Sequence, residues 1–198
     1  MSHVAYRPAS DGDRSALEAL LSGLSPESAY SRFQTALGPE PPRALVESLL
    51  PEGVRGGSVL AWDGPDPVAH GVWVRLGHSR AAEVALLVTD SHQRQGIGGA
   101  LAARLVADAR AQGIERIEVF SETGNRAVSR MVARGAPGAE RDLDGSTVTY
   151  SFPVPGPSLT RPRSGYAVHG VAPQPGDGAR GPARASLHRA PPRPGRAA

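Results

Sequence analysis

The segment that most constrains this fold is Val84–Val88, which leads within a few residues into a glycine-rich loop and then a helix. All of its residues are apolar, so a strand built from them has two faces that both need cover. The helix is predicted over residues 98–112, because Leu101 and Leu105 recur at helical spacing. A strand covered on both faces and followed by an amphipathic helix is typical of an α/β domain.

The rest of the chain supplies further elements in alternating order. Ser25-Pro26 is a typical helix start, with a capping serine and a proline in the first turn. From Gly57 onward the apolar period changes from helical to extended. Gly64–Pro67 predicts the turn of one hairpin, and Asp144-Gly145 predicts a type I′ turn in another. The predicted elements are a strand at 4–7, helices at 11–24, 26–33 and 45–50, strands at 58–62, 68–75 and 83–89, a helix at 98–112, a strand at 114–121, a helix at 125–134, and strands at 139–143 and 146–152.

Charge divides the chain into two regions. Residues 1–153 hold 15 arginines against 18 acidic residues, a net charge of −3, whereas residues 154–198 hold seven arginines against Asp177, a net charge of +6. The second region is also rich in proline and glycine, so we predict one domain over 1–153 and a disordered tail over 154–198. The basic balance of the chain therefore belongs to its tail, and nucleic-acid binding or tethering to an anionic partner through that tail is the lesser alternative.

Composition excludes several classes of site. The chain has no cysteine, which rules out disulfides, thiolate metal sites and a cysteine nucleophile. Its histidines, among them His70, His78 and His92, do not follow metal-ligand spacing, so we predict no metal. No stretch of eighteen apolar residues occurs, and Met1–Pro8 lacks the features of a signal peptide. We therefore expect a cytoplasmic protein that makes no use of a membrane.

The loop Gln93–Ala100 has the chemistry of an anion site. Glycines let backbone N–H groups converge on an anion, the start of the following helix adds a partial positive charge, and Arg94 adds a full one. A P-loop requires Lys followed by Ser or Thr where this chain has Gly99-Ala100, and a dinucleotide fingerprint requires glycine where it has Leu101. The alternative is a glycine-rich turn that binds nothing.

The same loop resembles the Q/R-x-x-G-x-G/A signature of the GNAT superfamily of N-acetyltransferases at Gln93, Gly96 and Gly98. The order of elements over residues 3–152 is also similar to that family, and the segment Leu24–Phe33 resembles bacterial GNATs related to protein lysine acetyltransferases. The resemblance implies the acyl-CoA acyltransferase fold: a mixed, mostly antiparallel sheet of six to seven strands flanked by about four helices. It also implies acetyl transfer from acetyl-CoA to an amine, by direct attack in a ternary complex.

The resemblance further implies which residues bind acetyl-CoA. Backbone groups of the strand are expected to pair with the pantetheine arm, and the Val88 amide to stabilise the charge that develops on the thioester oxygen. Asn125 is expected either to contact coenzyme A or to act only as a helix N-cap. The predicted cofactor-binding residues are Leu87, Val88, Thr89, Arg94, Gln95, Gly96, Ile97, Gly98, Gly99, Ala100 and Asn125.

Glu83 is the predicted general base. A carboxylate on the strand that lines the cleft can remove a proton from the attacking amine, directly or through one water. Many members of the family place an acidic residue on this strand, which the resemblance extends to Glu83. Otherwise a charge on a covered strand requires an ion pair or an exposed strand end.

No general acid is apparent for the leaving thiolate. Many relatives have a tyrosine where this chain has Val132, and the usual Gly-Phe at the helix end is Gly135-Ala136 here. The thiolate therefore leaves unassisted or protonated by water, or Ser129 or Tyr150 serves, or catalysis is weakened. The last case makes the chain a GNAT-fold acyl-CoA-binding or regulatory module. The acceptor is expected to be a small molecule or a protein amine, and the protein a monomer or homodimer.

Overall fold

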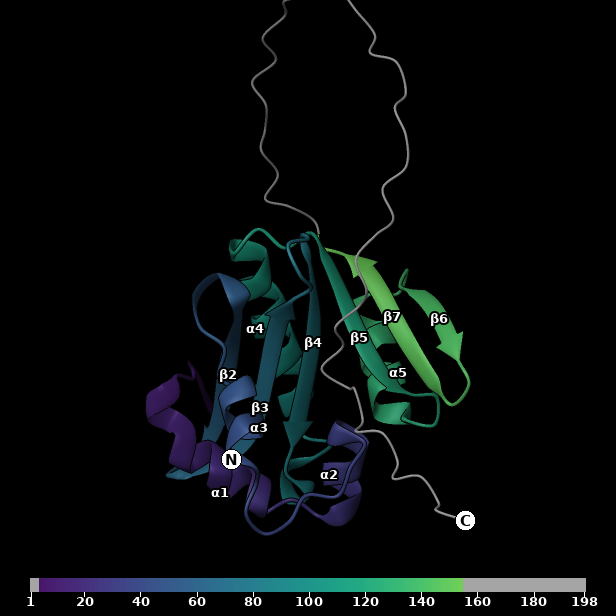
Figure 1. The fold of residues 1–198 in the computed structure, drawn as a ribbon. Helices are drawn as coiled ribbons and strands as arrows, with labels where there is room; N and C mark the ends of the chain where they lie inside the picture. The colour runs from purple at the N-terminus through teal and green to yellow at the C-terminus, as the bar shows by residue number, and fades with distance from the viewer. Residues whose placement is uncertain (1–3, 155–198) are drawn as a thin grey trace, which may run out of the picture.

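Residues 4–154, the part of the chain that the computed structural model describes, form a seven-stranded sheet with helices on both faces (Figure 1). The strand order is β1-β2-β3-β4-β5-β7-β6. Every neighbouring pair is antiparallel except β4 and β5, which are parallel. This confirms the predicted mixed, mostly antiparallel α/β fold; the described residues hold five α-helices, as the sequence pattern predicts, where the family resemblance implies about four.

The elements follow the predicted order. They are β1 (Ala5–Pro8), α1 (Arg14–Ser22), α2 (Pro26–Phe33), α3 (Arg43–Ser48), β2 (Gly56–Asp63), β3 (Asp66–Arg75), β4 (Ala81–Val88), α4 (Ile97–Ala111), β5 (Arg116–Glu122), α5 (Arg126–Gly135), β6 (Glu140–Asp144) and β7 (Thr147–Pro153), with short 3₁₀ turns at Asp11–Asp13, Gly53–Arg55 and Asp90–His92.

The two faces of the sheet are covered by different helices. Leu101 and Leu105 of α4 pack with Trp73 and Ile117 on one face. The helices α1 and α3 pack on the other face, in a cluster that includes Leu87 of β4. Since β4 contributes side chains to both clusters, the apolar strand is covered on both faces as its sequence predicts.

Local capping explains where α2 begins. The Ser25 hydroxyl accepts a hydrogen bond from the Ser28 amide at 3.2 Å, and Pro26 occupies the first turn, where a missing N–H costs nothing. This confirms the start predicted from Ser25-Pro26.

Both hairpins turn on a glycine at the first loop position. Asp144 pairs with Thr147, so the second loop consists of Gly145 and Ser146, and only Gly145 has a positive φ, at 57°. A type I′ turn needs positive φ at both central residues, so the prediction of type I′ is wrong and the angles fit type II′. In the first hairpin Gly64 likewise has φ 60°, and Pro65 completes the loop.

Val154, the first residue of the predicted tail, packs with the described domain. Val154 is buried in the α4 cluster, and its amide donates to the Glu115 carbonyl at 2.7 Å. The predicted tail from residue 155 onward lies outside the described residues. Within residues 4–154 no helix has the length and apolar character needed to cross a membrane.

Candidate functional site

Strands β4 and β5 pair only at their beginnings. Their parallel register runs through Ala81 with Arg116, Ala82 with Ile117 and Glu83 with Glu118, and within residues 4–154 it stops there. Both strands continue, β4 to Val88 and β5 to Glu122, without further pairing to each other. The sheet therefore holds a gap whose edges carry backbone groups that need partners.

The register of β4 on β3 decides which backbone groups face this gap. The Thr89 amide donates to the Val68 carbonyl and the Leu76 amide to the Ala81 carbonyl, both at 2.9 Å. Hydrogen-bonded pairs recur at every second residue of an antiparallel ladder. The backbone groups of Leu87 therefore point toward β3, and those of Leu86 and Val88 point toward β5.

This geometry alters the predicted backbone contacts. The Val88 amide lies on the gap side, where the sequence interpretation requires it. The Leu87 amide is directed to β3, and the Thr89 amide is already bonded there while its carbonyl accepts from His92 at 2.9 Å. The backbone N–H groups of Leu87 and Thr89 therefore face β3, whereas those of Leu86 and Val88 face the gap.

The predicted anion loop lies between β4 and α4. Gly96 caps the helix with φ 86°, Arg94 has φ 61°, and no side chain caps the first turn of α4. A Cβ added at Gly96 or Gly99 would meet nothing within 4 Å, so the N–H groups of this turn are approachable. Gly98 lies against the gap strand, where a Cβ would stand 3.6 Å from Leu86 and 3.7 Å from Val88 side-chain atoms. The arrangement offers backbone donors, a helix N-terminus and the exposed Arg94 to an anion.

Asp90 and Gln93 tie this loop to α2. The Asp90 carboxylate accepts from the Ser28 hydroxyl at 2.7 Å and from the Ser25 amide at 3.2 Å. The hydrogen bond from Ser28 is the main reason that the pKa of Asp90 lies below its usual range. Gln93 Nε2 donates to the Val88 carbonyl and lies near the Ser28 hydroxyl, each at 3.3 Å. Sequence reasoning missed Asp90, because nothing local marks it as a partner of residues more than sixty positions away.

Glu83 is the last residue of β4 that pairs with β5, so the gap begins there. Its side chain is buried, with 7% of the residue's surface exposed. Burial raises its pKa above the usual range, the positive charge of Arg32 opposes that rise, and the negative charge of Glu118 adds to it. Burial likewise lowers the pKa of Arg32 to about 10, against the opposing influence of Glu83. A carboxyl group with a raised pKa beside a gap in the sheet is a stronger base than an ordinary glutamate, which suits proton uptake at this position.

Arg32 was also missed by sequence reasoning. It stands on α2 next to Phe33, over whose ring its guanidinium carbon lies at 4.8 Å from the centroid. The segment 26–33 predicts a helix, but its sequence does not say that this helix faces β4. The signal that identifies Arg32 is the charge of Glu83, which is distant in sequence.

Asn125 caps α5 and links it to α2. Its side-chain oxygen accepts from the Val128 amide at 3.1 Å, and its Nδ2 donates to the Ser31 hydroxyl at 3.2 Å. The N-cap alternative is therefore present in the structure. Through Asn125 on one side and Asp90 on the other, α2 is attached to both elements that border the gap.

Replacing Asn125 with alanine is expected to lower the free energy of unfolding by about 0.5–2 kcal/mol, because the cap of α5 is lost. Urea denaturation of Asn125→Ala and of Asn125→Asp measures this. Asp retains the acceptor for the Val128 amide and should keep most of the stability. Equal losses in the two variants would contradict a capping role.

Two hydroxyl groups meet beneath α5. The Ser129 hydroxyl lies 2.8 Å from the Tyr150 hydroxyl, which comes from β7. Tyr150 is buried and packs with Val132 and Val148. Both groups that the sequence left open as proton donors therefore form one hydrogen-bonded pair.

His70 and His92 have structural partners. His70 is fully buried, and its Nε2 lies 2.7 Å from the Ser58 hydroxyl and 3.1 Å from the Leu49 carbonyl. Burial, with the charge of Arg32, lowers the pKa of His70 to about 3, so the ring is neutral. His92 Nε2 lies 3.3 Å from Asp63 of the first hairpin.

Comparison of the chain with known proteins identifies a family. Residues 26–135, more than half of the chain, match the profile of the Acetyltransferase (GNAT) family. The acetyltransferase Pat of Mycolicibacterium smegmatis is 34% identical over 146 residues, which are 69% of this chain and 42% of that protein. The chain therefore spans less than half the length of that relative.

Solved structures agree on the fold. The GNAT domain of S. lividans PAT superposes with a TM-score of 0.69 at 25% identity, covering 76% of this chain and 90% of that one. A putative acetyltransferase from Salmonella typhimurium, solved with its cofactor acetyl-CoA, has a TM-score of 0.59 at 13% identity and covers 80% of this chain and 98% of that one. With the profile match over α2 to α5, these similarities show that the chain belongs to the GNAT acetyltransferase family.

Proposed function

We propose that this protein transfers an acetyl group from acetyl-CoA to an amine by direct attack in a ternary complex. The observation that carries the proposal is the parting of β4 and β5 beside the uncapped N-terminus of α4. That juxtaposition offers an anion site at one end of a gap and backbone hydrogen-bonding groups along it. Glu83 stands where the gap begins.

The residues around the gap fit acetyl-CoA. The N–H groups of the first turn of α4, from Gly96 to Gly99, would hold the pyrophosphate together with the Arg94 side chain. The backbone groups of Leu86 and Val88 that face β5 would pair with the pantetheine arm as a further strand does. A GNAT-fold protein solved with acetyl-CoA supports this choice of ligand.

The chain's own residues supply two functions in the attack on the thioester. When bound, acetyl-CoA supplies the acetyl thioester. Glu83 removes the proton of the amine, directly or through one water, so that nitrogen forms a bond to the acetyl carbon and the carbon–sulfur bond breaks. The Val88 amide donates to the thioester oxygen as negative charge develops on it.

We assign the protonation of the thiolate to the Ser129–Tyr150 pair. Long helical side chains point back toward the helix N-terminus, so a tyrosine at position 132 would lie over residues 128 and 129. The Tyr150 hydroxyl reaches Ser129 from the sheet instead. A buried hydroxyl thus arrives in that region from β7 although position 132 is valine.

Tyr150→Phe is expected to lower kcat by about tenfold or more, since general acid catalysis commonly contributes 10²–10⁴-fold and water replaces part of it. The measurement is release of free thiol from acetyl-CoA under saturating substrates. Thr149→Val, on the same strand with its side chain on the opposite face, is the control and should retain activity. Unchanged kcat in Tyr150→Phe would remove Tyr150 from the mechanism.

The acceptor is proposed to be a cationic amine. The gap is bordered by Glu83 and Glu118 where the strands part and by Glu122 at the far end of β5, and these carboxylates attract an ammonium group before it is deprotonated. A lysine side chain, a protein N-terminus and a small amine all satisfy this requirement. The resemblance of Leu24–Phe33 to GNATs related to protein lysine acetyltransferases leads us to test protein acceptors first.

Two measurements test the function as a whole. Acetyl-CoA should raise the melting temperature in proportion to the logarithm of its concentration above Kd. Thiol release with a panel of amines and lysine peptides should then identify an acceptor. No thermal shift at millimolar acetyl-CoA would overturn the proposal, whereas tight binding with no acceptor would favour an acyl-CoA-binding or regulatory module.

A further inference from the structure

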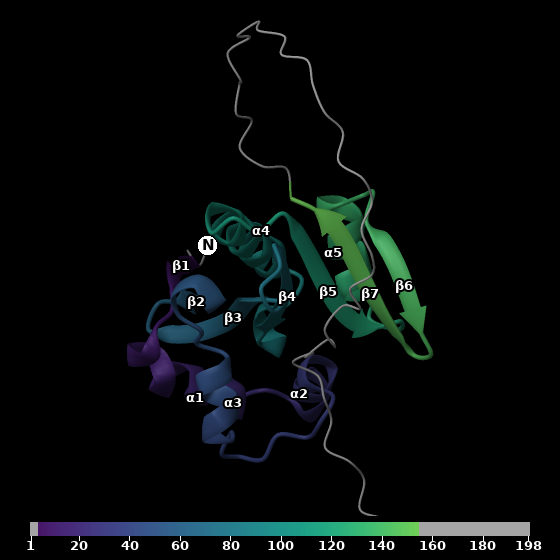
Figure 2. The same cartoon turned by 45° about the horizontal axis from the view of Figure 1, so that its top comes forward.

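One face of the strands β5, β7 and β6 carries no helix among the described residues. Figures 1 and 2 show α5 on the opposite face of these three strands. The register places on the open face the side chains that alternate with those beneath α5. We call this surface the acidic face; it consists of Arg116, Glu118, Phe120, Glu122, Glu140, Asp142, Asp144, Thr147, Thr149 and Ser151.

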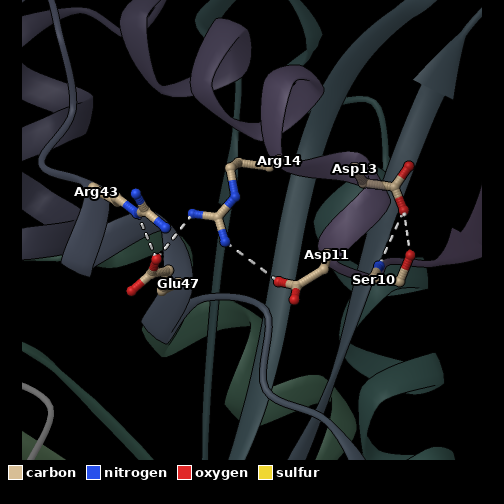
Figure 3. Close-up of polar contacts among 6 residues, drawn as sticks. All are labelled: Ser10, Asp11, Asp13, Arg14, Arg43 and Glu47. Carbon is tan, nitrogen blue, oxygen red and sulfur yellow. Dashed lines mark hydrogen bonds and ion pairs between the residues drawn. The ribbon is translucent and has the colours of Figure 1, made fainter.

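Its negative charge is largely uncompensated. Among residues 4–154, Glu122, Asp142 and Asp144 form no ion pair, and Glu140 is paired with Arg116. The acidic residues near α1 differ in this respect. Figure 3 shows Arg14 between the carboxylates of Asp11 and Glu47, with Arg43 also facing Glu47. The acidic face is therefore a surface that still attracts cations.

The acidic face already accommodates one guanidinium group. Arg116 Nη1 donates to the Ser151 hydroxyl at 2.6 Å and to Glu140 at 3.2 Å. Carboxylates and hydroxyls both accept from the N–H groups of arginine, and on this face the carboxylates of β6 stand opposite the hydroxyls of β7. A shallow depression on this face is lined by Glu118, Glu140, Asp142, Thr149 and Ser151 together with Arg116 and Arg141. The chemistry of the face is thus suited to further arginine side chains.

The chain carries such side chains in the segment that follows directly. Residues 155–198 hold seven arginines against Asp177. The segment starts after Val154, which is fixed beside the first residues of β5 by its bond to Glu115. Its 44 residues are enough to reach across the acidic face, since the seven residues of β7 extend over only about 23 Å. Covalent attachment makes a contact between this segment and the face intramolecular, which raises the effective concentration of its arginines there above that of a separate chain.

We propose that residues 155–198 bind the acidic face of the same molecule through their arginine side chains. Glu118 of the acidic face lies beside Glu83, where β4 and β5 part. The bound segment therefore borders the beginning of the gap. The segment contains no lysine, so it offers no side-chain amine for acetylation. The segment thus competes with other cationic chains for this surface without having a lysine side chain acetylated. The binding itself does not depend on the transferase activity proposed above.

Paramagnetic relaxation tests this in the full chain, which lacks cysteine and so accepts a single spin label. Ser186→Cys carrying a nitroxide should broaden the amide signals of β5, β6 and β7 at low salt and leave those of α1 and α3 sharp. The broadening should be lost at 0.5 M salt, where the Debye length falls to about 4 Å. It should also be lost in Glu140→Gln/Asp142→Asn/Asp144→Asn, and kept in the control Glu40→Gln/Glu52→Gln/Asp66→Asn, whose exposed acids lie elsewhere.

Broadening that is absent, that lies on another surface, or that survives neutralisation of the three β6 acids overturns the proposal. A second sample mixes spin-labelled chains at natural isotope abundance with ¹⁵N-labelled chains that carry no nitroxide. In this mixture the ¹⁵N signals are broadened only by the segment of a second copy. If the broadening proves to arise between molecules and not within one, the intramolecular contact is overturned. Since no acetyl-CoA or acceptor is present, failure of the transferase proposal does not affect these outcomes.

Discussion

Glu83→Gln is expected to reduce kcat for acetyl transfer by about 10²- to 10⁴-fold, the usual contribution of a positioned general base. The amide has nearly the shape of the carboxylate but does not accept a proton from the amine. Binding of acetyl-CoA should persist, because the α4 loop and the Val88 edge are unchanged. Stopped assays of thiol release and calorimetric titration with acetyl-CoA separate the two quantities.

The fold should not suffer from this substitution. Burial raises the pKa of Glu83, so keeping the carboxylate ionised near neutral pH costs folding free energy. A neutral amide removes that cost but leaves the buried Arg32 guanidinium without its opposing charge, so Glu83→Gln should remain folded with a melting temperature close to that of the native chain. Loss of activity together with loss of structure would therefore not support the assignment of Glu83 as the base. Full activity in a folded Glu83→Gln would contradict that assignment.

The pH dependence gives an independent check of the same residue. A base acts only when deprotonated, so kcat/KM should fall as pH decreases through the pKa of Glu83, which lies above 4.5. Arg32 lowers that pKa, so Arg32→Gln should move the acid limb to higher pH. Glu118 raises it, so Glu118→Gln should move the limb to lower pH. Shifts in the same direction would contradict the arrangement.

Features set by neighbouring residues were predictable from the sequence. Ser25 and Pro26 fix the start of α2 because a cap and a first turn involve contiguous positions. The Gln93–Ala100 loop was predictable for the same reason, since its glycines and the helix start adjoin each other. The hairpin at Gly145 was located correctly, but its turn type depends on which residues pair, and Asp144 belongs to the strand.

Features set by strand register or by contacts between distant segments were not predictable. Whether Leu86 or Leu87 faces the gap depends on a shift of one residue against β3, which reverses every backbone group. Arg32 and Asp90 join the site only because α2 packs at the end of β4. The Ser129–Tyr150 pair joins a helix to a strand that is twenty-one positions away. The sequence offers both hydroxyls, and only the fold brings them together.

The second large effect is expected at Gly99, where a glutamate should weaken acetyl-CoA binding by roughly 30- to 1000-fold. Gly99 lies in the first turn of α4, is exposed, and has open space where a Cβ would stand. Unit charges of the same sign about 4 Å apart repel by about 4 kcal/mol at the dielectric constant typical of a protein surface. Side-chain movement and salt reduce this to about 2–4 kcal/mol, which corresponds to that range of Kd.

The same glutamate should stabilise the fold, and this separates the charge effect from damage to the protein. A carboxylate in the first turn interacts favourably with the helix dipole, and replacing glycine removes a residue of poor helix propensity. The melting temperature of Gly99→Glu without ligand should therefore rise while its response to acetyl-CoA disappears. Gly99→Gln, equal in size and uncharged, should gain stability and keep most of the affinity. If Gln weakens binding as much as Glu, the side chain blocks the site by bulk. If neither variant changes Kd, the pyrophosphate does not bind at the start of α4.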